Sequence, residues 1–184
     1  SGATVIDPPG DSNVTTLYGI YSDSQTGLLI KNLGVTGAYN GIHFTNVDQS
    51  TITGDSASCN GNGGIRLNQG TAASGCDTNT ISANTANWNV DHGILVQNST
   101  YNKIDNNITN SNLNIGIGVQ GTPNILNLYN VVSNNTANFN LIGVLIDAQA
   151  RLNIVRNNVT KSNTQSGIWI QDSDTNIVVH NEIS

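Results

Sequence analysis

The sequence has little charge, few aromatic residues and no long apolar run. Lys, Arg, Asp and Glu make up 10% of the 184 residues and the net charge is −6, whereas charged residues are roughly 25% of an ordinary domain. Without a basic excess, the chain is not expected to bind nucleic acid. No segment approaches the roughly 20 apolar residues of a membrane-spanning helix, so no membrane span is predicted.

Methionine is absent and no signal peptide is recognisable. The chain is therefore expected to be a mature or excised segment. Cys59 and Cys76 are the only cysteines. A disulfide that staples an inserted loop is the preferred interpretation, and two free buried thiols are the alternative. Of five Asn-x-Ser/Thr triplets, those at Asn13 and Asn98 are the better glycosylation candidates. Together these features favour an extracellular or cell-surface location.

A repeat of about 23 residues organises the chain. Three polar columns, rich in Asn, recur at fixed positions, and each unit restarts with Gly followed by an aliphatic residue. The first column is Ser50, Asn79, Asn102, Asn130, Asn153 and Asn176. The second column is Asp55, Asn84, Asn107, Asn135, Asn158 and Asn181, and the third is Asn60, Asn89, Asn112, Asn140 and Asn163. A period of this length is typical of solenoids.

Short β-branched runs separated by Asn, Gly, Ser and Thr predict strands and turns. The Gly and Asn density excludes helical solenoids, and the Leu framework of leucine-rich repeats is absent. We therefore predict an all-β, single-stranded parallel β-helix of about seven coils. Residues 1–184 are expected to form one domain, with 1–16 as a lead-in or cap and 17–184 as coils. Stacked Asn side chains should form ladders between coils.

The Asn-Ile, Asn-Asn, Asn and Gly-Ile pattern resembles the right-handed parallel β-helix repeats of the pectate-lyase-like superfamily. The resemblance covers the chain from about Gly19 onward. It implies the fold but not an activity.

The Gly-Ile strand should present alternate residues outward. The candidates at these outward positions are Tyr21, His43 and Arg66, which would lie on adjacent coils beside Asp23. The remaining candidates for a carbohydrate or partner face are Asn68, Leu95, Gln97, Gln120, Leu145, Asp147, Trp169 and Gln171. Trp169 with the two leucines forms a stripe that suits a sugar or a neighbouring subunit.

The preferred hypothesis is a non-catalytic extracellular structural module. Its last coil stops without a cap, and an open strand edge is a template for another chain. We therefore expect either that copies stack end to end into a fibre or that the chain forms part of a longer one, with polysaccharide as a further expected partner. No cofactor is expected, and the three histidines should lie on distant coils and form no metal site.

The alternative hypothesis is a polysaccharide lyase or uronan C5-epimerase. The superfamily resemblance implies that His43 would be the base, Arg66 the cation and Tyr21 the acid. Against it, the sequence has no Tyr-Gly-Phe-Asp-Pro-His stretch like that of alginate epimerases and no Gly-His-Gly motif like that of polygalacturonases. Asp91-His92 is treated only as a local pair.

Overall fold

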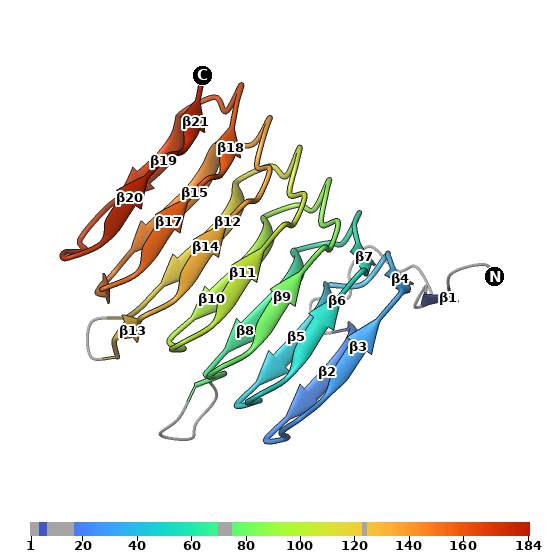
Figure 1. Cartoon of the computed structure of the whole chain (residues 1–184). Coiled ribbons are helices and arrows are strands. Elements are labelled where there is room, and N and C mark those ends of the chain that lie inside the picture. The colour runs from blue at the N-terminus through green and yellow to red at the C-terminus, as the bar shows by residue number, and fades with distance from the viewer. Residues whose placement is uncertain (1–3, 7–16, 70–74, 123–124) are drawn as a thin grey trace.

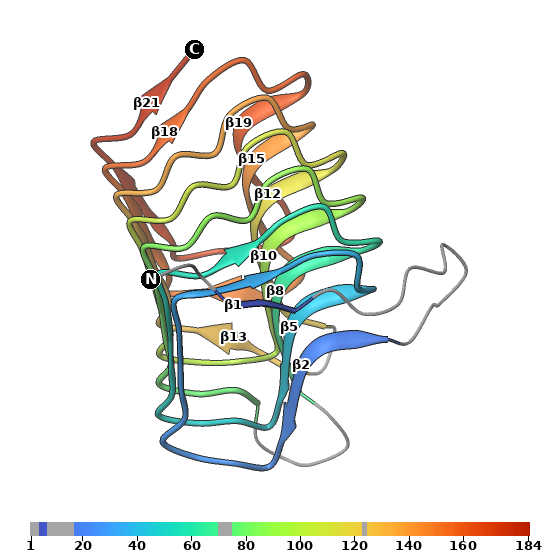
Figure 2. The ribbon, with the colours of Figure 1, turned by 90° about the vertical axis from the view of Figure 1, so that its right-hand side faces the viewer.

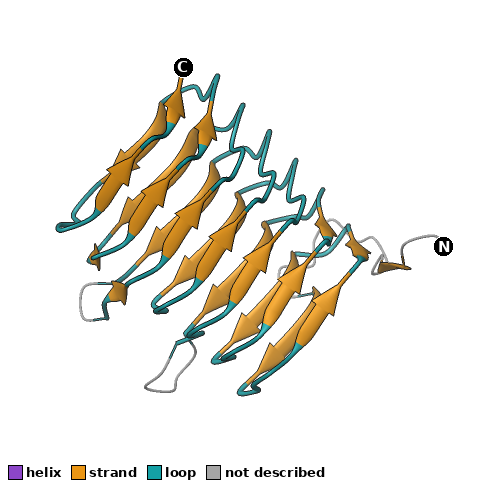
Figure 3. Cartoon of the chain, in the orientation of Figure 1, coloured by secondary structure: helices purple, strands orange, loops and turns teal. Residues whose placement is uncertain are grey.

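The computed structural model describes residues 4–6, 17–69, 75–122 and 125–184. It is a parallel β-solenoid in which each coil lies on the previous one (Figure 1). All the described regular structure is strand, and turns join the strands (Figure 3). The predicted fold class, with about seven coils of about 23 residues, is confirmed.

Two seven-stranded parallel sheets run the length of the stack, and we call them the first and second sheet. The first sheet contains β2 (Tyr18–Asp23), β5 (Asn40–Thr45), β8 (Gly63–Asn68), β10 (His92–Gln97), β12 (Ile115–Gln120), β15 (Ile142–Asp147) and β19 (Ser166–Ile170). The second contains β3 (Leu29–Lys31), β6 (Thr51–Thr53), β9 (Thr80–Ser82), β11 (Lys103–Asp105), β14 (Val131–Ser133), β17 (Ile154–Arg156) and β20 (Ile177–Val179).

Shorter strands complete the coils, and Figure 2 shows the coil outline. They are β1 (Thr4–Ile6), β4 (Leu33–Val35), β7 (Ser56–Ala57), β13 (Asn127–Leu128), β16 (Ala150–Arg151), β18 (Val159–Thr160) and β21 (Glu182–Ile183). The predicted lead-in contributes β1, which pairs with β4. Residues 7–16, and with them Asn13, lie outside the described part of the chain, as do residues 70–74 and 123–124.

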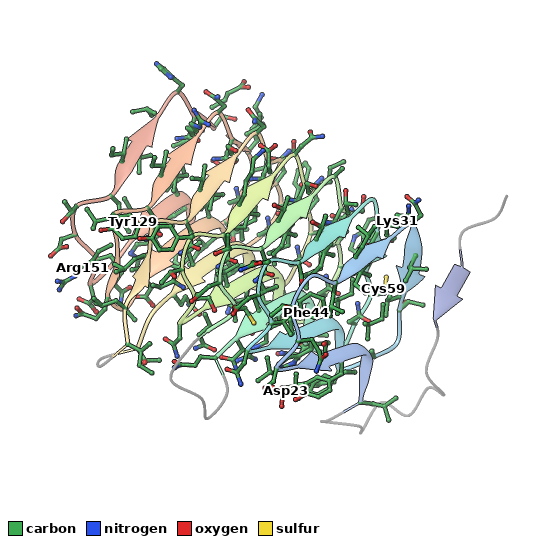
Figure 4. All side chains as sticks on the ribbon, turned by 60° about the horizontal axis from the view of Figure 1, so that its bottom comes forward. Asp23, Lys31, Phe44, Cys59, Tyr129 and Arg151 are labelled. Carbon is green, nitrogen blue, oxygen red and sulfur yellow. The ribbon has the colours of Figure 1, made fainter. Side chains whose placement is uncertain are left out.

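The interior is a stack of aliphatic side chains with one aromatic ring. Ile42, Ile65, Ile94 and Ile117 of the first sheet are fully buried. Phe44 is the large ring among them, and Figure 4 shows it within the stack. The Gly before each of these Ile residues permits close contact between coils. A Cβ on Gly116, for example, would lie 2.6 Å from the carbonyl oxygen of Gly143. A larger residue at this column would therefore force neighbouring coils apart.

All three predicted polar columns form buried ladders. In the second column, the Nδ2 of Asn107 donates to Oδ1 of Asn135 at 3.0 Å, and the Nδ2 of Asn84 donates to Oδ1 of Asn107 at 3.1 Å. The same amide oxygens accept from backbone N–H groups of the preceding coil. The ladders thereby pair polar groups that would otherwise be buried without partners.

Each ladder residue follows a corner residue in the left-handed conformation. Trp88 and Phe139 occupy such corners, with φ of 54° and 59°. Their side chains are 62% and 61% exposed, because the left-handed corner turns the side chain outward while the following Asn turns inward.

The disulfide prediction is also wrong, since both cysteines are free. Cys59 is exposed and lies just before the third ladder, whereas Cys76 is buried near the start of the first ladder. The Sγ of Cys76 lies 3.3 Å from the backbone N of Val47 and 3.4 Å from the carbonyl oxygen of Phe44. The two thiols therefore occupy different corners of the coil. Burial raises the pKa of Cys76 to about 11.

We predict that one thiol reacts quickly with a thiol reagent in the native protein and that the second reacts only on unfolding. Cys59 is accessible, while Cys76 is both buried and protonated at neutral pH. Thiol titration with and without denaturant measures this, and Cys59→Ser provides the control that should abolish the fast phase. If a reductant lowered the melting temperature, the protein would contain a disulfide, and the conclusion that both thiols are free would be wrong.

Asp55 is the one ladder residue with a buried oxygen lacking a partner. Its Oδ1 accepts from the backbone N of Leu33 at 2.9 Å, but no group within the described residues bonds Oδ2. Burial raises the pKa of this carboxyl above its usual value. In the third column, Asn60 occupies the matching place and donates through Nδ2 to Asn89. Asparagine therefore fits this position better than aspartate.

Asp55→Asn is expected to raise the free energy of unfolding at neutral pH by about 1–2 kcal/mol, the order of the cost of one buried unpaired polar group. A raised native pKa means that wild type loses stability as the pH rises through it, so the gain should shrink as the pH falls toward about 4. Denaturant unfolding at both pH values measures it. Asp172→Asn, at an exposed position, should change nothing. Equal or lower stability of Asp55→Asn at neutral pH would contradict this account.

Candidate functional site

The outer surface of the first sheet, which we call the first-sheet face, carries the predicted candidate residues. Strand pairing aligns Tyr21 with His43 and His43 with Arg66 on consecutive coils. The same register continues through Leu95, Gly118, Leu145 and Trp169. It also aligns Asp23, Thr45, Asn68, Gln97, Gln120 and Asp147. Gln171 lies just beyond β19 and is exposed.

His43 is more enclosed than an outward position suggests. Its side chain is only 6% exposed, because the ring of Tyr18 packs against it with centroids 4.4 Å apart and that of Tyr21 at 5.7 Å. Burial, assisted by the charge of Arg66 and by His92, lowers the pKa of His43 to about 4. The imidazole is therefore neutral at physiological pH.

Hydrogen bonds around Asn40 fix the tautomer of His43. The Oδ1 of Asn40 accepts from Nδ2 of Asn62 at 2.9 Å and from the backbone N of Gly63 at 3.0 Å. Because the amide oxygen of Asn40 has these two donors, the amide nitrogen Nδ2 of Asn40 is the atom that lies 3.1 Å from Nδ1 of His43. An amide N–H can only donate, so Nδ1 of His43 accepts, and the neutral ring carries its proton on Nε2.

Arg66 provides the cation of this face. Its Nη2 donates to Oε1 of Gln97 at 2.8 Å, which holds the guanidinium across two coils. Its Nε is buried and has no hydrogen-bond partner among the described residues. The guanidinium therefore retains hydrogen-bonding capacity for an anionic ligand.

His92 joins the candidate residues, although the sequence analysis placed it on a distant coil. Its imidazole occupies the space left by the missing side chain of Gly63, since a Cβ on that glycine would lie 2.2 Å from Nε2. Its Nδ1 lies 3.0 Å from Oδ2 of Asp91, and Asn114 donates to the other oxygen of Asp91 at 2.9 Å. These contacts lower the pKa of Asp91, with the bond to His92 the largest cause.

Sequence reasoning missed this grouping because it assumed strict alternation along each strand. The Gly of the Gly-Ile pair is absent from the strand register, which passes from His92 to Ile94 and from Asn40 to Ile42. The residue directly before the Gly consequently faces outward, beside the residue that lies two places after the Gly. The recurrence of chemically distinctive residues before the Gly, including Tyr18, Asn40 and His92, was the available signal.

The other half of the face is apolar and partly closed. Ile115 and Ile142 directly precede the Gly of their strands in the sequence. Both pack with Leu145, and Trp169 is half-buried against this cluster. Leu95 and Leu145 are each only 6% exposed, so the predicted open stripe of leucines is in fact covered. Only the Trp169 end retains an accessible ring. The candidate chemistry is thus concentrated in the first four coils.

Within the described ranges, no group of three or more His, Cys, Asp or Glu side chains could hold a metal ion. Nor is any helix in that part of the chain long and apolar enough to cross a membrane.

Residues 11–127 match a family described as "Right handed beta helix region". The chain belongs to this right-handed β-helix family. The match covers well over half of the sequence, so the predicted handedness and superfamily resemblance are confirmed. A search of curated proteins found no match to this β-helix.

Solved structures of similar fold include the periplasmic alginate epimerase AlgG, at 21% identity and a TM-score of 0.80 over 91% of this chain and 42% of that one. The A-module of the Azotobacter vinelandii mannuronan C-5 epimerase AlgE6 is 19% identical, with a TM-score of 0.75 over 86% of this β-helix and 42% of that chain. This chain therefore spans less than half the length of these structures. At such identities the similarity establishes the fold alone.

Proposed function

We propose that the first-sheet face binds a uronic-acid polysaccharide and removes the C5 proton from one of its sugars. This removal is the first step of both a lyase and a C5-epimerase. The observation that carries the proposal is the clustering of a neutral His43, a fixed Arg66 and Tyr21 on consecutive coils of one face. The fold-level likeness to alginate epimerases agrees with it but does not assign the activity.

The chemistry of a uronate accounts for this choice of residues. Removing the C5 proton leaves a carbanion conjugated with the sugar carboxylate, and the added negative charge must be stabilised. Arg66 can pair with that carboxylate through its guanidinium. A neutral imidazole and a tyrosine hydroxyl on the same face can exchange protons with the sugar. Protonation of C5 from the opposite side gives the epimer, while loss of the O4 substituent gives a 4,5-unsaturated sugar.

The test is proton NMR of polyuronates incubated with the protein in D2O. Both reactions pass through loss of the C5 proton, so the C5 proton signal should fall in either case: the epimer gains deuterium at C5, and the unsaturated end has no hydrogen at C5. His43→Gln should reduce exchange, whereas His180→Gln on the second-sheet side should not. The proposal fails if alginate and pectate chains both retain their C5 protons while the folded protein is present.

A non-catalytic structural role is the second candidate. In this chain the strands of the last coil expose apolar side chains, with Ile177 53% and Ile183 56% exposed. Copies that stack coil on coil would cover these residues and continue the ladders from Asn176 and Asn181. Sedimentation at increasing concentration should then show a growing series of oligomers, which Ile183→Lys should suppress. A single monomeric species at all concentrations would refute stacking.

An extracellular location is part of the proposed uronate-modifying function, because a polysaccharide-modifying protein must meet its polymer outside the cytoplasm. Glycosylation of Asn98 also remains a prediction. Its side chain is half-buried and its Oδ1 has no partner within the described residues.

A further inference from the structure

The hydrogen bonds of the first-sheet face assign different roles to its two histidines. We infer that His92, oriented by Asp91, is the proton acceptor of the site and that His43 donates a hydrogen bond to the sugar through Nε2. This inference rests on the proposed function, and it reverses the role that the superfamily resemblance implied for His43.

The acceptor role follows from the partner of each ring nitrogen. The carboxylate of Asp91 can only accept, so Nδ1 of His92 must carry a proton to bond it at 3.0 Å. In the neutral ring, Nε2 then holds the lone pair. This nitrogen is buried and has no hydrogen-bond partner among the described residues. In His43 the pattern is reversed, because Nδ1 accepts from Asn40 and Nε2 carries the proton.

Several groups preserve this tautomer of His92. Asn114 donates to the second oxygen of Asp91 and so keeps the carboxylate aimed at Nδ1. The side chain of His92 is 1% exposed, and the absence of a side chain at Gly63 gives the ring its place. A carboxylate that orients an imidazole and stabilises its protonated form is a recurrent arrangement for a general base.

Access to Nε2 requires a side chain to move, since the atom is buried in the ligand-free protein. In the proposed reaction, that side chain is Arg66. It belongs to the strand over which the His92 ring lies, it is half-buried, and its Nη2 donates a hydrogen bond to Oε1 of Gln97. In that reaction a ligand carboxylate draws the guanidinium away from Gln97, and the movement opens a path to the lone pair. The C5–H bond would then break, its electron pair would pass into the sugar carboxylate system, and the proton would move to Nε2 of His92.

The tautomers can be measured without any substrate. In 15N-labelled protein at neutral pH, long-range 1H–15N correlation spectra should show His92 with a proton on Nδ1 and His43 with a proton on Nε2. His180, the third and last histidine, is exposed and should show an exchanging mixture. A spectrum with the proton of His92 on Nε2 would overturn the inference, whether or not the protein has an activity.

Asp91→Asn supplies the functional arm. An amide at position 91 can present its N–H to Nδ1, which would then accept and shift the proton of His92 to Nε2. We expect the spectrum to show this change and C5 exchange to fall at least 100-fold, while oligouronate affinity stays within about threefold. His92→Gln should lose exchange to the same degree. If oligouronates bind but Asp91→Asn exchanges C5 normally, His92 is not the acceptor; if no variant or wild type exchanges C5, the proposed function fails and the tautomer result still stands.

Discussion

Arg66→Gln is expected to lower kcat/KM for C5 proton exchange by about 100- to 1,000-fold, the usual effect of removing one group that stabilises developing negative charge. Glutamine keeps some length and hydrogen-bonding capacity but removes the charge that would pair with the sugar carboxylate. The fold should be unaffected, because the guanidinium makes its described side-chain hydrogen bond to Gln97 at the surface and not in the core.

Kinetics of C5 exchange on oligouronates, with circular dichroism as a check on folding, measure this effect. Arg156→Gln is the matched control. Arg156 is exposed on the second sheet, outside the proposed site, so its replacement should leave the rate unchanged. Arg66→Lys separates charge from geometry, since lysine keeps the charge but not the paired donors, and an intermediate rate is expected. An Arg66→Gln protein with the wild-type rate would exclude this residue from the reaction.

Asn107→Ala is expected to lower the free energy of unfolding by about 3–5 kcal/mol, the range seen when a buried polar network is broken. The Oδ1 of Asn107 accepts from both the backbone N and the Nδ2 of Asn84. Its Nδ2 donates to Ile81 and Asn135. Alanine removes all of these bonds and leaves their partners buried, where water cannot replace them.

Asn181→Ala tests this explanation within the same ladder. Asn181 accepts from Asn158 and donates to Val155, but it is only partly buried, so water can bond to the groups that its removal leaves. We expect a loss of about 1 kcal/mol, as for a typical net hydrogen bond. Denaturant unfolding of both variants measures the difference. Similar losses at the two positions would show that the ladder bonds themselves, and not their burial, set the cost.

Much of the architecture could be predicted from the sequence because one period controls it. Asn at three fixed places in each coil indicated three turns, and the Gly-Ile pairs indicated the first sheet. In a parallel solenoid the register between neighbouring coils follows from that period. The alignment of Tyr21, His43 and Arg66 could therefore be predicted, although they are more than 20 residues apart.

The corner residues were less predictable. Trp88, Phe139 and the two cysteines break the repeat pattern, and the period says where a residue lies in the coil but not where its side chain points. The left-handed backbone at Cys59, Trp88 and Phe139 decided that point. It turned two rings outward and separated a cysteine pair that sequence reasoning had joined.

The sequence by itself thus determined the number of coils, the ladders and the order of residues along each column, because each depends only on the spacing of residue types. Only the tertiary structure decided which columns share a surface. The first-sheet strands leave their Gly residues out of the pairing, so that the residue before each Gly faces outward beside the residue two places after that Gly. This local departure from alternation brings Tyr18 to His43 and lets His92 lie over Gly63. The site exists because packing between coils, and not the spacing within one coil, sets which side chains meet.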